Sequence, residues 1–215
     1  MDVIVKLAMR YQSPSMTEGM EYLKNEGCSK IVVIPFFPQY ASATTGSVYE
    51  KVSQIISNWQ TIPEISFVNT FYDHPRLING FVQNAKKWID SQGYDHFVFS
   101  YHGIPARQIR KGDHTNNTCK LGSCCDSITP DNQLCYRAQC FATTRLLVKE
   151  LGLNEGSYTT CFQSRLGKET WVQPYTEDIV EELAKDGTKK VLAFSPAFVA
   201  DCLETTLEVG EEYKE

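Results

Sequence analysis

His102 is the residue whose type and position best suit proton transfer. It ends the apolar run HFVFSYH (96–102), a predicted strand, and Gly103 and Pro105 follow it. An imidazole exchanges protons near neutral pH because its unperturbed pKa is about 6.5. A lone histidine is more often structural, but ligands of parallel α/β sheets bind at the carboxyl ends of strands. We therefore take His102 as a candidate catalytic residue.

A row of carboxylates forms the second candidate. The segment AFVADCLETTLEVGEEY (197–213) is predicted to be a helix, with Glu204, Glu208 and Glu212 on one face and Asp201 a turn earlier. Such a row is usually a solvated face. Carboxylate oxygens also suit divalent cations, so the row is a candidate cation path. A carboxylate among carboxylates is expected to have a raised pKa, which would suit a proton relay.

Five of the eight cysteines fall within one short segment. Four thiolates complete the shell of a [2Fe–2S] cluster or a structural zinc, although the spacing is not that of a zinc ribbon. Free buried thiols and redox disulfides are the alternatives. If a metal binds, one cysteine is spare, and we expect Cys124 or Cys125 to be the spare one. The clustered residues are Cys119, Cys124, Cys125, Cys135 and Cys140.

An almost uncharged loop and one tryptophan could contact a flat apolar ligand. The loop PFFPQYASATTGS (35–47) carries aromatic, small and hydroxyl residues, and Trp171 offers a further aromatic surface. Ordinary core packing is the alternative for each aromatic residue.

Around these residues, short apolar runs alternate with segments whose apolar residues recur at helical spacing. This alternation is typical of a parallel α/β sheet. Predicted strands cover 30–35, 65–71, 96–102, 158–164 and 190–196, with a further short one at 3–9. Predicted helices cover 17–26, 47–58, 73–91, 136–151, 176–186 and 197–213, and Asp73 is expected to cap the third. Segments 17–37 and 176–198 resemble each other: in both, a predicted helix is followed by Gly, Lys, a predicted strand, Pro and Phe. This similarity fits two similar lobes around a cleft, and it also fits two ordinary αβ units.

Composition narrows the possible partners. The net charge is −5 and no block of Lys or Arg stands out, so we expect no nucleic-acid binding. No apolar run reaches the roughly 20 residues that span a bilayer, and the start lacks a signal-peptide pattern. We therefore expect a cytosolic location with reduced thiols, and peripheral membrane contact stays open. The oligomeric state does not follow from the sequence.

Several long stretches, in the same order, resemble bacterial ferrochelatases. They are MRYQSPS (9–15), PFFPQYASATTGS (35–47), SYHGIPARQIRKGD (100–113), CYRAQCFATTRLL (135–147), FQSRLGKETWVQPYTED (162–178) and PAFVADCLETTLEVGEEYKE (196–215). The resemblance implies two Rossmann-like lobes of the chelatase type with parallel sheets and a porphyrin cleft between them. We expect the first lobe at 1–95 and the second at 96–215, which would include a cysteine-rich insert (114–140) and the acidic helix.

The resemblance also implies an activity: insertion of ferrous iron into protoporphyrin IX, the last step of haem synthesis. His102 and Glu204 match the two central active-site residues, and Asp201, Glu208 and Glu212 match the family's acidic row, which with them would handle the metal. The implied porphyrin contacts are Tyr40, Ser42, Thr44, Thr45 and Trp171.

The insert resembles those of ferrochelatases that hold a [2Fe–2S] cluster, for which Cys119, Cys125, Cys135 and Cys140 are the expected ligands. The family has an additional N-terminal stretch and a further C-terminal helix, so the sequence is expected to be partial at both ends. Two other functions remain: a chelatase for another metal and tetrapyrrole, and a non-catalytic module that binds an iron–sulfur cluster or haem.

Overall fold

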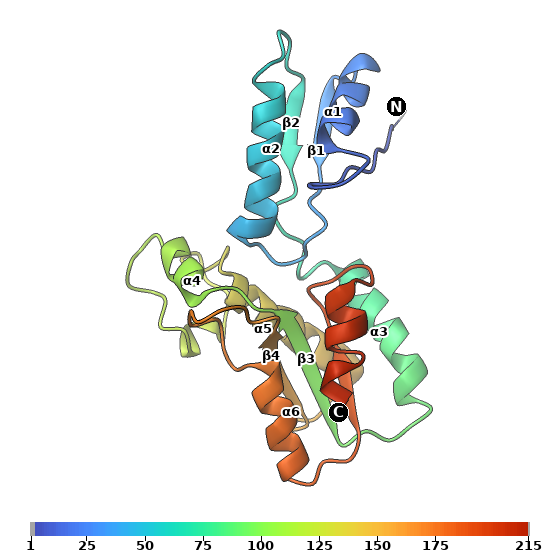
Figure 1. Cartoon of the computed structure of the whole chain (residues 1–215), viewed down its shortest axis with the longest axis vertical. Helices are drawn as coiled ribbons and strands as arrows, with labels where there is room; N and C mark the ends of the chain where they lie inside the picture. The colour runs from blue at the N-terminus through green and yellow to red at the C-terminus, as the bar shows by residue number, and fades with distance from the viewer. Residues whose placement is uncertain (1–2, 215) are drawn as a thin grey trace. The chain divides into compact units, whose positions relative to one another are not determined.

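The structure, a computed structural model, describes residues 3–214 and divides into two compact units (Figure 1). The first contains the chain up to Phe36 and residues 40–70, and the second contains residues 37–39 and the chain from Phe71 onward. Each unit holds a parallel sheet with helices packed on it, which confirms the predicted α/β class.

In the first unit, two parallel strands are covered by two helices that contact each other. The capping box of Ser15 and Glu18 starts the first helix, and Gly27, at φ +69°, follows its end. A core of apolar side chains joins the helices to the sheet. The elements are α1 (Met16–Asn25), β1 (Lys30–Val33), α2 (Ser47–Ile56) and β2 (Glu64–Phe67).

Two predictions for the first unit were wrong or incomplete. The run at 3–9 forms no strand; its only ladder contact is an isolated bridge between Met9 and Ser15. The loop after β1 contains a π-helix, η1 (Ser42–Gly46), that the sequence did not predict.

In the second unit, the central strand is buried on both faces. β3 (His96–His102) lies between β4 (Tyr158–Gln163) and β5 (Val191–Phe194), all parallel. The five interior residues of β3 are buried, and Phe99 stacks on Phe194 with ring centroids 4.7 Å apart. Burial on both faces explains why this run is mostly apolar rather than alternating, and its one buried hydroxyl, that of Ser100, is hydrogen-bonded.

Four helices complete the second unit: α3 (Pro75–Ile89), α4 (Ala106–Gly112), α5 (Tyr136–Leu151) and α6 (Thr176–Lys185). α3 packs against α5 and so belongs to this unit, although the sequence analysis placed it in the first lobe. Its cap is His74 rather than Asp73, because the His74 ring accepts from the Arg76 N–H. The short α4 was not predicted.

The C-terminal segment differs most from its prediction. Helical geometry begins at Leu203, not at 197, and continues as the π-helix η3 (Glu204–Glu208) and the 3₁₀ turn η4 (Glu212–Lys214). The late start has a local cause: the Thr205 hydroxyl accepts from the Cys202 N–H at 3.0 Å and caps the first turn. Gly210 is required after η3, because a Cβ there would lie 2.3 Å from the Thr206 carbonyl oxygen.

The two similar sequence segments fold alike. α1, Gly27 and β1 follow one another in the first unit, and α6, Gly187 and β5 do so in the second, with both glycines at positive φ. Among residues 3–214, no helix has the length and hydrophobicity to cross a bilayer.

Candidate functional site

The carboxyl ends of β3 and β4 bring two polar side chains together in the second unit. His102 ends β3 and pairs in register with Gln163, which ends β4. The buried Tyr136, at the start of α5, donates a hydrogen bond to the His102 carbonyl oxygen at 2.6 Å. Neighbouring strands and a helix thus fix the main chain beneath the imidazole.

The His102 ring has a defined tautomer. Nδ1 lies 2.6 Å from the Gly103 carbonyl oxygen. A carbonyl only accepts, so Nδ1 carries the proton and Nε2 keeps the lone pair of the neutral imidazole. The half-buried ring can therefore accept a proton at Nε2.

Aromatic side chains surround His102. The rings of Trp171 and Phe198 lie 6.4 and 6.2 Å from it, centroid to centroid. The Trp171 segment is held beside α4 by hydrogen bonds from Val172 N–H to the Ile104 carbonyl and from Ala106 N–H to the Thr170 carbonyl. The structure thus brings Trp171 to His102, as expected for residues of one site.

Glu204 is half-buried and has a lowered pKa. The main cause is a hydrogen bond from its own backbone N–H, and the Cys202 thiol and the charge of His102 act in the same direction against burial. The expectation of a raised pKa was wrong, because hydrogen bonds to the carboxylate outweigh the effect of burial. Glu204 is therefore ionised at neutral pH, as a cation ligand or proton acceptor would be.

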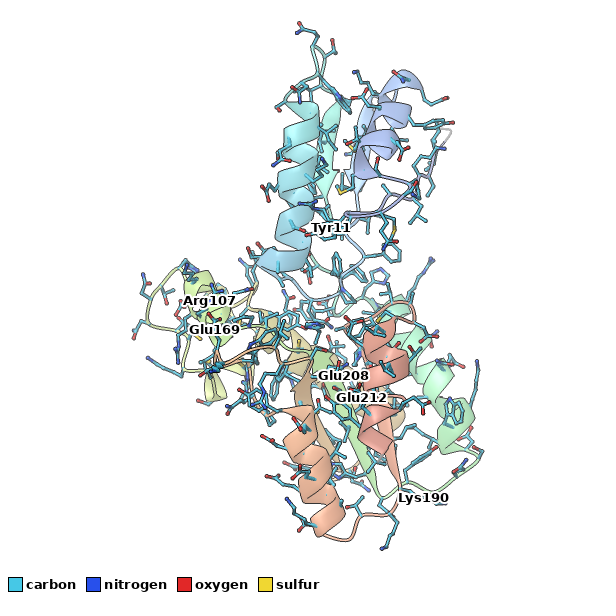
Figure 2. All side chains as sticks on the ribbon, viewed as in Figure 1. Tyr11, Arg107, Glu169, Lys190, Glu208 and Glu212 are labelled. Atoms are coloured by element: carbon cyan, nitrogen blue, oxygen red, sulfur yellow. The ribbon has the colours of Figure 1, made fainter. Side chains whose placement is uncertain are left out.

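The other acidic residues do not form an equivalent row. Asp201 and Glu212 are exposed, whereas Glu208 is half-buried and accepts hydrogen bonds from Gln163, Ser164 and Tyr213. Figure 2 labels Glu208 and Glu212 on the C-terminal segment. Both line a cavity of about 460 Å³ that also contains Ser164 and Tyr213.

In the first unit, the predicted porphyrin contacts lie around η1 and differ in exposure. Ser42 is exposed, Tyr40 and Thr44 are half-buried, and Thr45 is fully buried. The Thr45 hydroxyl has no hydrogen-bond partner among the described residues. In this conformation the side chains of Tyr40, Ser42 and Thr44 are at least partly exposed, whereas that of Thr45 is buried.

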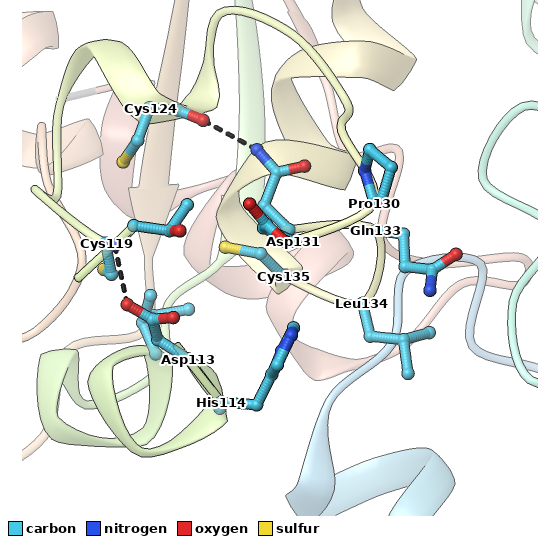
Figure 3. A pocket seen from close by; sticks show the side chains of 13 residues that line it. Asp113, His114, Cys119, Cys124, Pro130, Asp131, Gln133, Leu134 and Cys135 are labelled. Atoms are coloured by element: carbon cyan, nitrogen blue, oxygen red, sulfur yellow. Dashed lines mark hydrogen bonds between the residues drawn. The ribbon is translucent and has the colours of Figure 1, made fainter. Parts of the chain in front are cut away.

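The cysteine insert is an ordered loop that encloses a cavity of about 260 Å³ (Figure 3). Asp113 accepts hydrogen bonds from Thr115 and from the Cys119 N–H, and these bonds lower its pKa. Asn132 donates to the Cys124 carbonyl oxygen at 2.7 Å and accepts from the Thr129 N–H. Cys119, Cys124 and Cys135 line the cavity, whereas Cys140 lies fully buried on α5.

The thiols are neighbours without forming a metal-binding group. Cys124 and Cys125 lie 3.9 Å apart, Sγ to Sγ. A hydrogen bond from the Cys125 thiol and the backbone N–H groups that open α5 lower the pKa of Cys135. Within residues 3–214, however, no three His, Cys, Asp or Glu side chains are arranged to hold a metal ion. The expected four-cysteine set is therefore not preformed.

Arg137 connects this insert to the Trp171 segment. Its side chain is 9% exposed and lies over the Phe141 ring, 4.4 Å from the centroid. Its guanidinium donates to the Gly122 carbonyl in the insert and to the Gln173 carbonyl beyond Trp171, both at 3.3 Å. One buried cation thus supports both loops.

Sequence reasoning missed Gln163 and Ser164. Both contact the segment that carries Glu204, and both stand at the end of a predicted strand. The rule that led to His102, inspection of the carboxyl end of each strand, would also have found them.

Known proteins resemble this chain over nearly its whole length. A family model described as Ferrochelatase matches residues 1–215. The ferrochelatase of Legionella pneumophila (strain Corby) is 44% identical over 211 residues, covering 98% of this chain and 62% of the relative. That of Pseudomonas fluorescens (strain Pf0-1) is 40% identical over 213 residues, with coverages of 98% and 62%. The chain thus spans 62% of the length of these curated relatives.

A solved structure described as SirB from Bacillus subtilis with Fe3+ is similar to this chain, with a TM-score of 0.56. The sequences are 15% identical, and the match covers 94% of this chain and 67% of the other. At this identity the comparison shows a shared fold.

Proposed function

Because this chain belongs to the ferrochelatase family, we propose that it inserts ferrous iron into protoporphyrin IX, the last step of haem synthesis. The observation that carries the proposal is His102, with Nε2 free to accept a proton, on the same unit as the ionised Glu204. Iron insertion releases two pyrrole protons and exchanges iron's water ligands for four nitrogens. A proton acceptor and an anionic metal ligand meet these two requirements.

Each side chain receives a role. His102 accepts pyrrole protons at Nε2. Glu204 binds the incoming cation or passes protons onward. A planar macrocycle hides its lone pairs from a metal that approaches its face, so an enzyme gains rate by bending the ring. Trp171, beside His102 in the second unit, contacts the porphyrin for that purpose, and Tyr40, Ser42, Thr44 and Thr45 of the first unit are further proposed porphyrin contacts.

The remaining acidic residues extend the cation path. Asp201 and Glu212 are exposed and free to meet hydrated iron, and Glu208 lies between them in the chain. In this proposal, Glu208 also holds η3 in place, because hydrogen bonds from three residues reach its carboxylate.

Two substitutions test the catalytic roles. His102→Ala and Glu204→Gln, made in the intact protein, should each reduce ferrous insertion by about 100-fold or more while the fold is retained. Loss of porphyrin fluorescence measures insertion, and circular dichroism measures folding. His96→Ala is the matched control, because His96 lies at the opposite end of the same strand. Wild-type turnover in His102→Ala or Glu204→Gln would exclude that residue from catalysis.

The same assay separates the alternative functions. A panel of tetrapyrroles offered with ferrous, cobalt and nickel ions should show turnover with porphyrin and iron. Preference for a sirohydrochlorin or a corrin would indicate a different chelatase. Tight haem or cluster binding without turnover of any pair would indicate a non-catalytic module.

We further propose that the insert binds a [2Fe–2S] cluster through four of its five clustered cysteines. The grouping of thiols around one cavity and the nearby buried guanidinium support this, and binding requires the 119–125 loop to rearrange. After anaerobic reconstitution, visible absorbance and iron and sulfide content should be lost in Cys119→Ala and Cys135→Ala. Comparing Cys124→Ala with Cys125→Ala identifies the spare thiol, which should be the one whose loss leaves the cluster bound. No bound iron or sulfide in the wild type would refute the proposal.

We also propose a cytosolic location with peripheral membrane contact. A pool of reduced cysteines suits the cytosol. Fractionation of cells with and without a high-salt wash tests both parts: release by salt supports peripheral contact, and recovery in the periplasm would contradict the location.

A further inference from the structure

Gln163 ends β4 as a buried amide with a partner at each end. Its side chain is 2% exposed. Oε1 accepts a hydrogen bond from the Ser100 hydroxyl at 2.7 Å. Nε2 donates to the Glu204 carbonyl oxygen at 3.0 Å and to the Glu208 carboxylate at 3.2 Å. Every partner belongs to the second unit.

The surrounding groups allow one orientation of this amide. If the amide were turned over, Oε1 would face the Glu204 carbonyl and the Glu208 carboxylate, which are both acceptors. Each of these two partly buried acceptors would then face another acceptor in place of a donor, and the buried amide nitrogen would lose both of its partners, which is unfavourable. Ser100 is itself fixed by a 2.7 Å hydrogen bond to Thr176, the first residue of α6. A continuous set of hydrogen bonds therefore runs from α6 through β3 and β4 to η3.

Ser164 reinforces this hold on η3. Its N–H and its hydroxyl each donate to the Glu208 carboxylate at 2.6 Å. It does so with φ at 63°, a conformation that residues other than glycine adopt rarely and only where their surroundings hold them. Tyr213 adds a further donor at 2.9 Å. Glu208 is thus anchored from the end of β4 and from the turn after η3.

We infer that Gln163 is a positioning residue that sets where Glu204 stands relative to His102. The inference rests on the proposed function, since it concerns the same two side chains. Gln163 is the register partner of His102 in the sheet. Gln163 therefore lies beside His102 in the sheet and at the same time holds the Glu204 main chain through its side chain. If Glu204 moved away from His102, the hydrogen bond from the Gln163 Nε2 to the Glu204 carbonyl oxygen would break.

The hydrogen bond from Gln163 matters because Glu204 lies on a π-helix, a rare and weakly stable backbone geometry. Its closing bond, from Val209 N–H to the Glu204 carbonyl oxygen, is 3.2 Å long. That carbonyl is the group to which Gln163 donates. π-Turns are rare and occur mostly at functional sites, so an external donor at this point stabilises the wider turn.

The test replaces Gln163 by Met, which keeps the length of the side chain and removes both hydrogen-bonding ends. In the intact protein, kcat for iron insertion should fall about 10- to 100-fold, because misplacement of a reacting group by about 1 Å has an effect of this size. The KM for porphyrin should stay within about threefold of wild type, since the Gln163 side chain is buried and offers almost no surface to a ligand. Gln60→Met is the matched control, at an exposed position of the first unit.

Hydrogen–deuterium exchange supplies a readout that does not need activity. In Gln163→Met, amides of residues 203–211 should exchange faster than in wild type, while those of β3 should not change. Ser100→Ala removes only the partner of Oε1, so it should reduce kcat less than Gln163→Met does.

The outcomes separate the two proposals. An inactive wild type refutes the proposed function, and the exchange data then still decide whether Gln163 holds η3. Unchanged exchange at 203–211 overturns the inference. The inference is also overturned if exchange at 203–211 becomes faster while kcat stays at the wild-type value, or if the variant changes only the KM.

Discussion

At the scale of single residues, the position of one proton and one charge defines the site. The Gly103 carbonyl accepts a hydrogen bond from the Nδ1–H of His102, so that Nε2 is the basic nitrogen, and the hydrogen bonds around Glu204 keep its carboxylate ionised. Both effects come from groups within two residues of the side chain concerned. The chemistry is thus set locally, once the main chain has brought the two residues to one unit.

Gly103 should tolerate no side chain. A Cβ there would lie 2.9 Å from the Gln163 carbonyl oxygen and 3.1 Å from the Trp171 ring, so Gly103→Ala must displace one of them. We expect iron insertion to fall about tenfold or more, because the ring beside His102 moves. Gly80→Ala is the control: nothing lies within 4 Å of its Cβ position on α3, and it should be neutral or slightly stabilising. Equal activity in both variants would contradict the prediction.

The Cys202 thiol should influence the pH dependence of the reaction. It donates to the Glu204 carboxylate and lowers its pKa, so Cys202→Ala should raise that pKa. A higher pKa means that Glu204 becomes protonated at a higher pH. The acid limb of kcat/KM, measured from about pH 3 to pH 7, should therefore move to higher pH, by less than about one unit. A shift to lower pH would contradict the prediction, because it would mean that the smaller side chain lowers the pKa of Glu204 by reducing its burial more than the lost hydrogen bond raises it.

At the scale of elements, loops are positioned by buried groups on α5. Arg137 supports the cysteine insert and the Trp171 segment through one guanidinium, and Tyr136 supports the end of β3. Both residues stand in the first turn of the helix. The start of α5 is therefore a shared support for the insert and for the residues around His102.

Arg137→Met should destabilise the protein measurably. It removes the two hydrogen bonds that the buried, charged guanidinium donates to the Gly122 and Gln173 carbonyls, and a hydrogen bond of a charged group contributes about 1.5–3 kcal/mol. Arg107→Met is the control, because its ion pair with Glu169 is exposed (Figure 2) and such pairs contribute about 0–1 kcal/mol. Urea unfolding of both variants measures the difference. Equal free energies of unfolding would mean that the buried guanidinium holds neither loop.

At the scale of the whole molecule, each unit has its own sheet and core, and the second unit contains the more deeply buried strand. β3 is covered on both faces, whereas β5 leaves Val191 38% exposed. Stability in the second unit should therefore depend more on β3 than on its neighbour β5.

Phe99→Ala tests this distribution. Phe99 is fully buried, so its truncation should lower the free energy of unfolding by about 3–5 kcal/mol. Since native proteins are stable by only about 5–15 kcal/mol, the variant should unfold at a much lower urea concentration. Val191→Ala should cost about 1 kcal/mol or less, because much of its side chain already contacts water. A comparable loss in both would refute the ranking of the strands.

Patterns that act over short stretches were read correctly from the sequence. Five strands and five of the six predicted helices exist near their predicted bounds, because apolar periodicity, capping residues and C-terminal glycines are local signals. The sixth helix starts six residues late and winds as a π-helix, because Thr205 and Gly210 impose local bonds and contacts that an α-helical periodicity does not register.

The family, the parallel α/β class and the position of His102 at a strand end could be read from residue types and their order. The lowered pKa of Glu204 could not, because it depends on the local conformation that brings the Glu204 N–H and the Cys202 thiol to the carboxylate. The links from Gln163 to the Glu204 segment and from Arg137 to the insert and the Trp171 segment also required the folded protein. They depend on which groups far apart in the chain come within hydrogen-bonding distance, and a linear pattern does not encode such distances.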